Sequence, residues 1–419
     1  MSVQVSVLAN GLRVATDRMD TLETVSVGVY VGVGTRHEAA EVNGVAHLLE
    51  HMAFKGTTTR SARRIAEEIE AVGGQMNAHT GREQTAYYIK LLKEDLALGV
   101  DMLSDILLRS IFDPAELDRE RTVVLQELGQ ANDTPDDIIF DHFQETAFPG
   151  QALGRPVLGR AEVIARLPRD SLLEYCRRHY GARAMVVAAS GNLEHQTLVH
   201  LAGLAFADLR PEAEAVLEPA RYGGGDYREA RELEQLHLVM GFPGVAHADP
   251  DYYAAAVLAT MLGGGMSSRL FQEIRESRGL CYAISAFSGS FLDGGLFGIY
   301  TGTGEREVGE LMPVLIGELR RAMEPPPALE LARARAQMKA SLLMSLESTS
   351  ARMDALASQL LVFGRPIPTE EIASRIEAVG APDVARVARR IFTGRPTVAA
   401  LGPLGALEPH AKLAARLAA

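Results

Sequence analysis

Apolar residues alternate with polar ones in some parts of the chain and follow helical spacing in others. The first part of the chain alternates, which predicts strands there. Residues 3–17 alternate apolar and polar side chains around Asn10-Gly11, a dipeptide that favours a tight hairpin turn. Residues 24–34 alternate strictly, with small residues on one face. A helix could approach that face closely, because small side chains leave room for its backbone.

Helical periodicity dominates the rest of the first half. The predicted helices cover the segment around His47 and then 61–72, 94–109, 115–131 and 134–143, with strands at 75–80 and 84–92. A loop punctuated by glycine and proline spans 148–160, and helices from 161 and 170 lead to a buried strand at 184–190. This half is therefore expected to be α+β, with a mostly antiparallel sheet.

The second half repeats this order of elements. We place a linker at 211–225, which ends in three glycines, between domains at 1–210 and 226–419. The repeat comprises a strand at 236–242, helices at 252–261 and from 267, strands at 283–291 and 295–302, and long helices near 305–323 and 328–346. The pattern predicts an internal duplication of roughly 200 residues per copy.

Composition narrows the class of protein. The chain has 419 residues, of which 47% are hydrophobic and 23% charged, so each domain can bury a full core. Cys176 and Cys281 are too few for a disulfide framework, and no signal sequence or membrane-length apolar run is present, so we expect a soluble, cytoplasmic protein. The net charge of −12 argues against nucleic acid or anionic membrane as partners and is compatible with basic ligands.

One helical segment carries candidate metal chemistry: His47-Leu48-Leu49-Glu50-His51. Residues four apart leave the same face of a helix, so the two imidazoles can meet one ion while Glu50 lies beside them. This His-x-x-Glu-His pattern is a zinc-peptidase motif, with the carboxylate placed to take a proton from water. The alternative is a chance grouping of two histidines and a glutamate. Apolar neighbours predict that the helix packs into a core.

Zinc requires a third protein ligand and an open position for water. The helix predicted at 115–131 carries Glu120 and Glu127, which lie two turns apart and share a face. A glutamate in that position could orient a ligand glutamate. The alternative for such a pair is a solvated acidic helix face.

On these residues the sequence resembles the pitrilysin/insulinase family of zinc metallopeptidases over nearly its whole length. It is most like the branch that includes the mitochondrial processing peptidase. The resemblance implies one zinc ion per chain and two homologous domains that face each other as a clamshell, of which only the first holds metal. It assigns His47, His51 and Glu127 as ligands, Glu50 as the general base and Glu120 as an outer-shell residue.

Other stretches match the family with less specific motifs. Asn77-Ala78 resembles an edge strand that binds the substrate backbone by strand addition, and His79 beside it is not a family ligand. Arg275 and Tyr282 match an Arg/Tyr pair that the second domain brings over the zinc, where both could donate to an oxyanion. Arg278 is a rival for the arginine, and a solvated Arg275 with a core Tyr282 is the alternative reading.

Two further groups carry expectations about substrate and assembly. Gly263-Gly264-Gly265 matches a substrate-contacting loop and lacks the ending of a nucleotide-binding P-loop. Asp137 and Asp141 lie where processing peptidases recognise an arginine, although a solvated face is as good an explanation. Because the zinc motif, the loop and the Arg/Tyr pair occupy one chain, the resemblance implies a homodimer and leaves a heterodimer with a related chain open.

The sequence therefore predicts a zinc-dependent endopeptidase that cleaves short or unfolded peptides, with a preference for arginine near the scissile bond. The alternatives are a non-catalytic peptide-binding or scaffold subunit of a heteromeric complex and a zinc hydrolase that acts on another amide.

Overall fold

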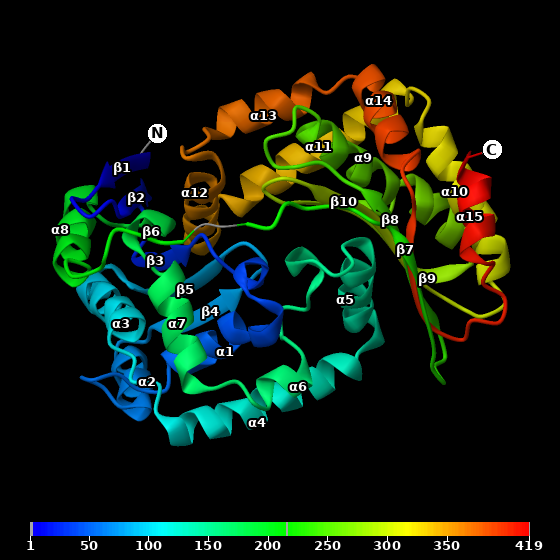
Figure 1. The fold of residues 1–419 in the computed structure, drawn as a ribbon. Coiled ribbons are helices and arrows are strands. Elements are labelled where there is room, and N and C mark those ends of the chain that lie inside the picture. The colour runs from blue at the N-terminus through cyan, green and yellow to red at the C-terminus, as the bar shows by residue number, and fades with distance from the viewer. Residues whose placement is uncertain (1–2, 215–216, 419) are drawn as a thin grey trace. The chain divides into compact units, whose positions relative to one another are not determined.

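The computed structural model describes residues 3–214 and 217–418 (Figure 1). Met1, Ser2 and two residues of the predicted linker, 215 and 216, lie outside them. The chain divides into two compact units, and neither is one continuous stretch. The first unit runs to Gly129 and adds Arg155–Glu218 and Leu343–Ile367; the second holds Gln130–Gly154, Pro219–Leu342 and the segment from Pro368.

The first unit is built on a six-stranded sheet. Its strands are β1 (Val3–Val7), β2 (Arg13–Arg18), β3 (Thr24–Val31), β4 (Gln75–Thr80), β5 (Thr85–Leu92) and β6 (Met185–Gly191). They lie in the order β1-β2-β6-β3-β5-β4, and every neighbouring pair is antiparallel except β2 and β6. Strand β4 therefore ends the sheet at an edge.

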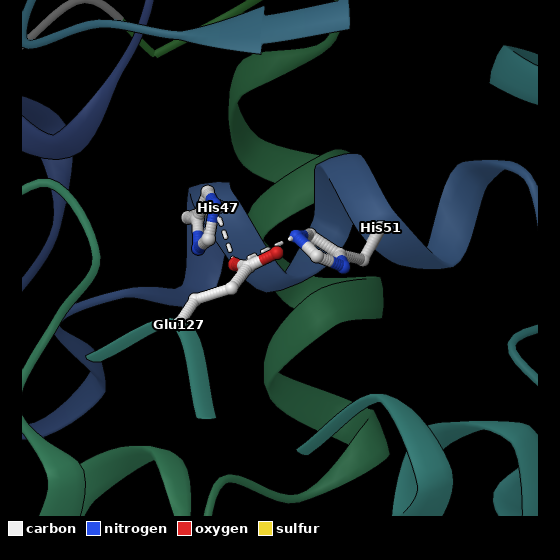
Figure 2. Close-up of side chains that lie close together, drawn as sticks. All are labelled: His47, His51 and Glu127. Carbon is white, nitrogen blue, oxygen red and sulfur yellow. Dashed lines mark ion pairs between the residues drawn. The ribbon is translucent and has the colours of Figure 1, made fainter. Parts of the chain in front are cut away.

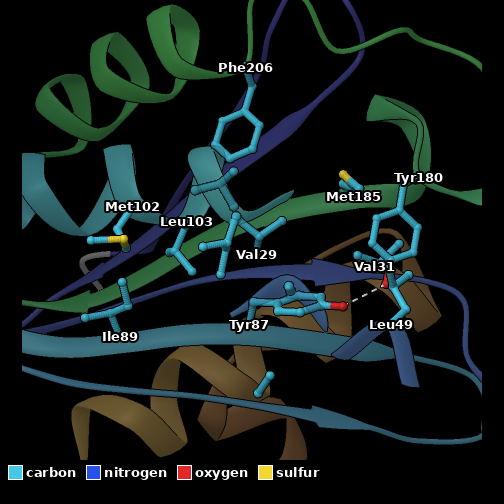
Figure 3. Packing of buried hydrophobic residues seen from close by; sticks show 14 of the residues in the cluster. Val29, Val31, Leu49, Tyr87, Ile89, Met102, Leu103, Tyr180, Met185 and Phe206 are labelled. Carbon is cyan, nitrogen blue, oxygen red and sulfur yellow. Dashed lines mark hydrogen bonds between the residues drawn. The ribbon is translucent and has the colours of Figure 1, made fainter. Parts of the chain in front are cut away.

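Helices cover one face of this sheet and bury its larger core. They include α1 (Val45–Ala53), α3 (Leu96–Leu108), α7 (Arg169–His179) and α8 (His195–Ala205), with α2 (Ala62–Ala71), α4 (Pro114–Asn132) and α6 (Ala161–Ile164) near them in the chain. Val29 and Val31 of β3 pack with Leu49 of α1 in this core (Figure 3). The hydroxyl groups of Tyr87 and Tyr180 lie 3.1 Å apart, so the two buried phenols satisfy one another.

The other face of the first sheet is covered by a helix from near the C-terminus, α12 (Thr349–Phe363). A Cβ atom at Gly32 would lie 3.2 Å from Leu361, and the Ser26 hydroxyl lies 2.8 Å from that of Thr349. The small residues predicted to admit a helix are thus in contact with α12. The sequence did not indicate which helix this would be.

The second unit repeats the sheet topology. Its strands are β7 (Gly225–Ala230), β8 (Leu236–Pro243), β9 (Cys281–Ser290), β10 (Gly295–Thr303) and β11 (Thr397–Gly402), in the order β7-β11-β8-β10-β9. That order reproduces β2-β6-β3-β5-β4, and the one parallel pair, β7 with β11, falls at the equivalent place. The predicted α+β class and the internal duplication are confirmed.

Helices of the second unit follow the same plan. One face carries α9 (Tyr252–Gly263), α10 (Val308–Ala322), α11 (Ala328–Ser345), α14 (Ala381–Phe392) and α15 (His410–Ala418), with α13 (Thr369–Ala378) beside α9. The other face carries α5 (Pro135–Ala147), whose Phe143 occupies the space a side chain at Gly241 would need. Each sheet is therefore completed by a helix from the other half of the sequence.

One predicted helix differs in type. The segment expected to be helical from 267 contains a π-helix, Phe271–Glu276, instead of regular α-helical turns. Periodicity alone does not reveal such a widened turn, which often occurs at functional sites. Within residues 3–214 and 217–418, no helix combines the length and apolarity needed to cross a bilayer.

Candidate metal centre

Helix α1 begins at a buried carboxylate. Its N-cap, Gly44, has a φ of +96°, which favours glycine, and supplies no side chain to cap the helix. The Glu38 carboxylate accepts hydrogen bonds from the backbone N–H groups of Gly44 and Ala46, both 2.8 Å away, and from Asn43 Nδ2 at 2.9 Å. The carboxyl group satisfies unpaired N–H groups at this end of the helix, and its ionised form interacts favourably with the positive end of the helix dipole. Burial raises the pKa of Glu38 to about 7. Glu38 was not predicted as part of the site, because it caps the helix from six residues upstream of Gly44 and no local pattern marks it.

The apolar side of α1 fixes its rotation about the helix axis. Val45, Leu48, Leu49 and Met52 are buried in the core of the first unit. Because these positions follow helical spacing, His47, Glu50 and His51 leave the helix on the remaining face. The core thus aims the motif outward toward α4.

Helix α4 brings Glu127 to the two histidines (Figure 2). Glu127 Oε2 lies 3.7 Å from His47 Nε2 and 3.4 Å from His51 Nε2, and one ligand atom from each residue falls within 4.8 Å of the others. Tetrahedral ligands about 2.0–2.1 Å from a zinc ion lie about 3.3 Å apart. The structure therefore brings together three donors of the types and spacing that suit zinc.

A hydrogen bond to His51 and the burial of His47 favour the forms of the two imidazoles that can bind a metal. His51 Nδ1 lies 3.0 Å from Glu120 Oε2, and since a carboxylate only accepts, Nδ1 donates to it; in the neutral imidazole Nε2 then keeps its lone pair for a metal. Lys55 Nζ lies 2.6 Å from the other oxygen of Glu120. Burial, with a smaller contribution from His51, lowers the pKa of His47 to about 4, so His47 is neutral at pH 7. Neutral imidazole is the form that ligates a metal.

Glu50 lies next to this group of ligands and contacts the sheet edge. The hydroxyl of Thr80 on β4 donates a hydrogen bond of 2.6 Å to Glu50 Oε2. Burial raises the pKa of Glu50, while the Thr80 bond acts in the opposite direction. A carboxylate with a raised pKa is a better proton acceptor for catalysis near neutral pH. The motif predicted Glu50 but gave no sign of Thr80.

The predicted substrate strand, β4, is an edge with an available backbone. The Ala78 N–H group donates to its own neighbour, Asn77 Oδ1, at 2.8 Å. In an antiparallel pair the N–H and C=O groups of one residue point to the same side. The Ala78 backbone therefore faces away from β5, toward the free edge, and its N–H is satisfied by a local side chain.

The predicted Arg/Tyr pair is formed within the second unit. The Arg275 guanidinium lies 5.0 Å from the ring centroid of Tyr282 and 4.5 Å from that of Phe271. Tyr282 is 75% exposed, so it is not a core aromatic. The rival Arg278 lies 3.7 Å from Glu310 instead. Of the two candidates, Arg275 is the arginine stacked on Tyr282.

The remaining predicted residues also lie in the second unit. Asp137 is exposed and Asp141 partly buried, on α5. The glycine loop is packed closely: a Cβ atom at Gly263 would lie 2.2 Å from the Ala286 nitrogen, and the Gly264 carbonyl accepts a 2.6 Å hydrogen bond from Gln337. Close approach of the chain therefore accounts for Gly263 without a ligand.

Comparison with known proteins identifies the family. The family model described as "Insulinase (Peptidase family M16)" matches residues 13–161, and "Peptidase M16 inactive domain" matches residues 166–338. A protein of Rickettsia felis named as an uncharacterized zinc protease is 37% identical over 400 residues, which are 95% of this chain and 97% of that protein. This chain belongs to the insulinase family, M16. The family resemblance inferred from the motifs is confirmed.

Other M16 relatives are similar along nearly their full length. A Bacillus subtilis protein, also named as an uncharacterized zinc protease, is 36% identical and is matched over 94% of this chain and 97% of its own. A probable mitochondrial-processing peptidase β subunit of Arabidopsis thaliana is 37% identical, over 99% of this chain and 81% of its own. The resemblance to the processing-peptidase branch is thus confirmed at the level of the family.

Solved structures share the fold of this M16 chain. A protease from Helicobacter pylori superposes with a TM-score of 0.88 at 22% identity and covers 96% of this chain and 99% of its own. A chain of complex III2 from Candida albicans gives a TM-score of 0.87 at 22% identity, with 99% of each chain covered. At this identity the likeness concerns the fold alone.

Proposed function

We propose that this protein is a zinc-dependent endopeptidase that cleaves short or unfolded peptides. The observation that carries the proposal is the grouping of His47, His51 and Glu127 donor atoms within 4.8 Å, beside a partly buried Glu50. Three protein donors and an adjacent carboxylate are the composition of a hydrolytic zinc site. The edge strand β4, joined to Glu50 through Thr80, offers an extended peptide a backbone to pair with.

The residues of the first unit divide the chemistry between them. A zinc ion held by His47, His51 and Glu127 would supply Lewis acidity and lower the pKa of water. Glu50 takes the proton from the attacking water and delivers it to the leaving amine. Glu120 holds the tautomer and orientation of His51, and Lys55 holds Glu120. Ala78, together with Asn77, binds the peptide backbone at the edge.

The second unit supplies the remaining proposed roles. Tyr282 and Arg275 are donors for the developing oxyanion, and an exposed phenol stacked by a guanidinium is chemically suited to that task. Asp137 and Asp141 share one face of α5 and could pair with a basic side chain of the substrate. The 263–265 loop contacts substrate. The proposed role of Tyr282 can be tested by mutation. Because the oxyanion forms only in the transition state, Tyr282→Phe should lower kcat with little change in KM.

We propose a homodimer as the assembly, because one chain contains the zinc ligands, the glycine loop and the Arg/Tyr pair. The Arabidopsis relative is named as a β subunit, so a heteromer is the rival. Light scattering coupled to size-exclusion chromatography on the purified chain, alone at micromolar concentration, should give the mass of two chains. A monomer would favour the heteromer.

The proposed activity is tested by digesting a peptide library with the purified protein. We expect cleavage within peptides that stops on addition of a zinc chelator and returns with added zinc. Bound zinc without chelator-sensitive cleavage would instead favour a non-catalytic peptide-binding subunit. Cleavage of non-peptide amides alone would favour another hydrolase.

A further inference from the structure

We propose that a second site in the first unit receives an arginine side chain of the bound peptide, on the face of the sheet opposite the zinc ligands. The proposal rests on the peptidase function and on strand addition to β4. It concerns a cavity of about 370 Å³, bounded by β3 to β5 and the start of α12. Its walls include Tyr30, His79, Tyr88, Ser350 and Asp354.

The pleat of the edge strand directs peptide side chains to this cavity. Successive side chains of a strand point to opposite faces of a sheet, and paired residues on adjacent strands point to the same face. Thr80 of β4 reaches Glu50, so it marks the α1 face, and His79 must point to the other one. A peptide added beside β4 therefore places every second side chain on the face that His79 shares, and the one opposite His79 lies next to the cavity that His79 lines.

The position of the cavity favours a long peptide side chain. A strand added to β4 lies about 4.8 Å beyond it, and Tyr88 belongs to β5, one strand further inward. A short side chain would end beside His79, whose ring centroid is 5.9 Å from that of Tyr88. A long side chain is needed to pass His79 and enter the space next to Tyr88.

The residues that line the cavity favour a peptide side chain with a positive charge and a planar group. Among the residues that line the cavity, Asp354 is the one acidic side chain, and none is lysine or arginine. Tyr30 lines the cavity together with Asp354, and burial and the Asp354 carboxylate raise the pKa of the Tyr30 phenol, so the phenol keeps its proton. The aromatic rings of Tyr88 and His79 offer faces for stacking. Arginine combines the required length with a planar cation that stacks and pairs with carboxylates, whereas lysine does not stack in this way.

A pair of peptides tests the inference. Fluorogenic peptides are made with arginine or citrulline, its neutral isostere, at each position around the cleaved bond. For the native protein we expect kcat/KM to be about tenfold higher for arginine than for citrulline at one position, the one opposite His79, which is the effect of one charge-assisted hydrogen bond. Asp354→Asn should reduce this ratio toward one, because it removes the charge that distinguishes arginine from citrulline. Glu347→Gln, an exposed acid just before α12, should leave the ratio unchanged.

A second variant separates stacking from charge. Tyr88→Leu removes an aromatic wall on which a guanidinium stacks, so it should weaken binding of both peptides and lower their ratio only in part, because Asp354 remains. Preserved discrimination in Asp354→Asn, or no arginine preference in the native protein, overturns the inference.

Equilibrium binding keeps the inference testable apart from catalysis. Fluorescence anisotropy with labelled forms of the same peptides, in the presence of a zinc chelator, should show about tenfold tighter binding of the arginine form. Discrimination that depends on Asp354 without any cleavage would support the pocket and contradict the peptidase function. Cleavage without discrimination would do the reverse.

Discussion

Helices α1 and α9 occupy equivalent positions in two sheets of the same topology. Helix α1 follows β3 and helix α9 follows β8, the middle strand of the five-strand order that the two sheets share, and each precedes the pair of strands that ends at a sheet edge. On α1 one face is apolar and the other bears His47, Glu50 and His51. Seven of the twelve residues of α9 are buried, and all seven are apolar. The fold thus requires only an apolar face, and metal chemistry depends on what the other face carries.

The largest effect is expected from breaking the polar face of α1. His51→Ala removes a donor of the proposed site and leaves Glu120 without its histidine. Peptidase activity should fall at least about a thousandfold, since a zinc site with two protein donors holds its metal poorly. Metal content by mass spectrometry and peptide turnover check this. Zinc retained at one per chain with native activity would contradict it.

A smaller effect on zinc binding is expected from mutating Glu120, which contacts the proposed ligand His51. Glu120→Gln keeps the shape of the side chain but removes the charge shared by His51 and Lys55. Zinc affinity should fall about 10–100-fold, as for other outer-shell partners. Competition with a chromophoric chelator measures it. Asp118→Asn on the same helix, exposed and paired with Arg121, is the control and should bind zinc normally.

A mutation in the apolar helix α9 should lower the stability of the protein and leave zinc binding unchanged. Leu258→Ala in α9 deletes a fully buried side chain and should lower the free energy of unfolding by about 2–5 kcal/mol. Zinc affinity should stay native, because no proposed ligand lies on this helix. Denaturant unfolding and metal competition on the same sample compare the two. Loss of zinc in the folded variant would show that the helices are not independent in this way.

A gradual effect is expected in the pH dependence of the stability of the zinc-free protein. Burial lowers the pKa of His47 from its ordinary value of 6.5 to about 4. Between these values the unfolded chain binds the proton and the native chain does not, so stability falls as pH falls from 6.5 to 4. The contribution is at most about 3 kcal/mol. His47→Asn should flatten the slope without abolishing it, since burial also lowers the pKa of His37 to about 4. Unfolding in chelator across this range measures it.

The sequence predicted those parts of the molecule that rest on local patterns. Alternation and helical spacing located β3, β4 and β5, and the five-residue motif located the polar face of α1. The parts it missed depend on contacts between distant residues. Glu38 caps α1 from an irregular segment, Thr80 reaches Glu50 from the edge strand, and α12 packs on β3 from more than 300 residues away. No local pattern encodes such pairings.

The central claim is that α1 combines metal binding with a separate proton acceptor, and Glu50→Gln tests it most directly. The variant should bind one zinc per chain with native affinity, because Glu50 is not among the three grouped donors. It should lose peptide cleavage by about 10²–10⁴-fold, the effect of removing a general base. Zinc titration and turnover of one fluorogenic peptide, measured on the same preparation, give the answer. Native turnover with bound zinc would contradict the account.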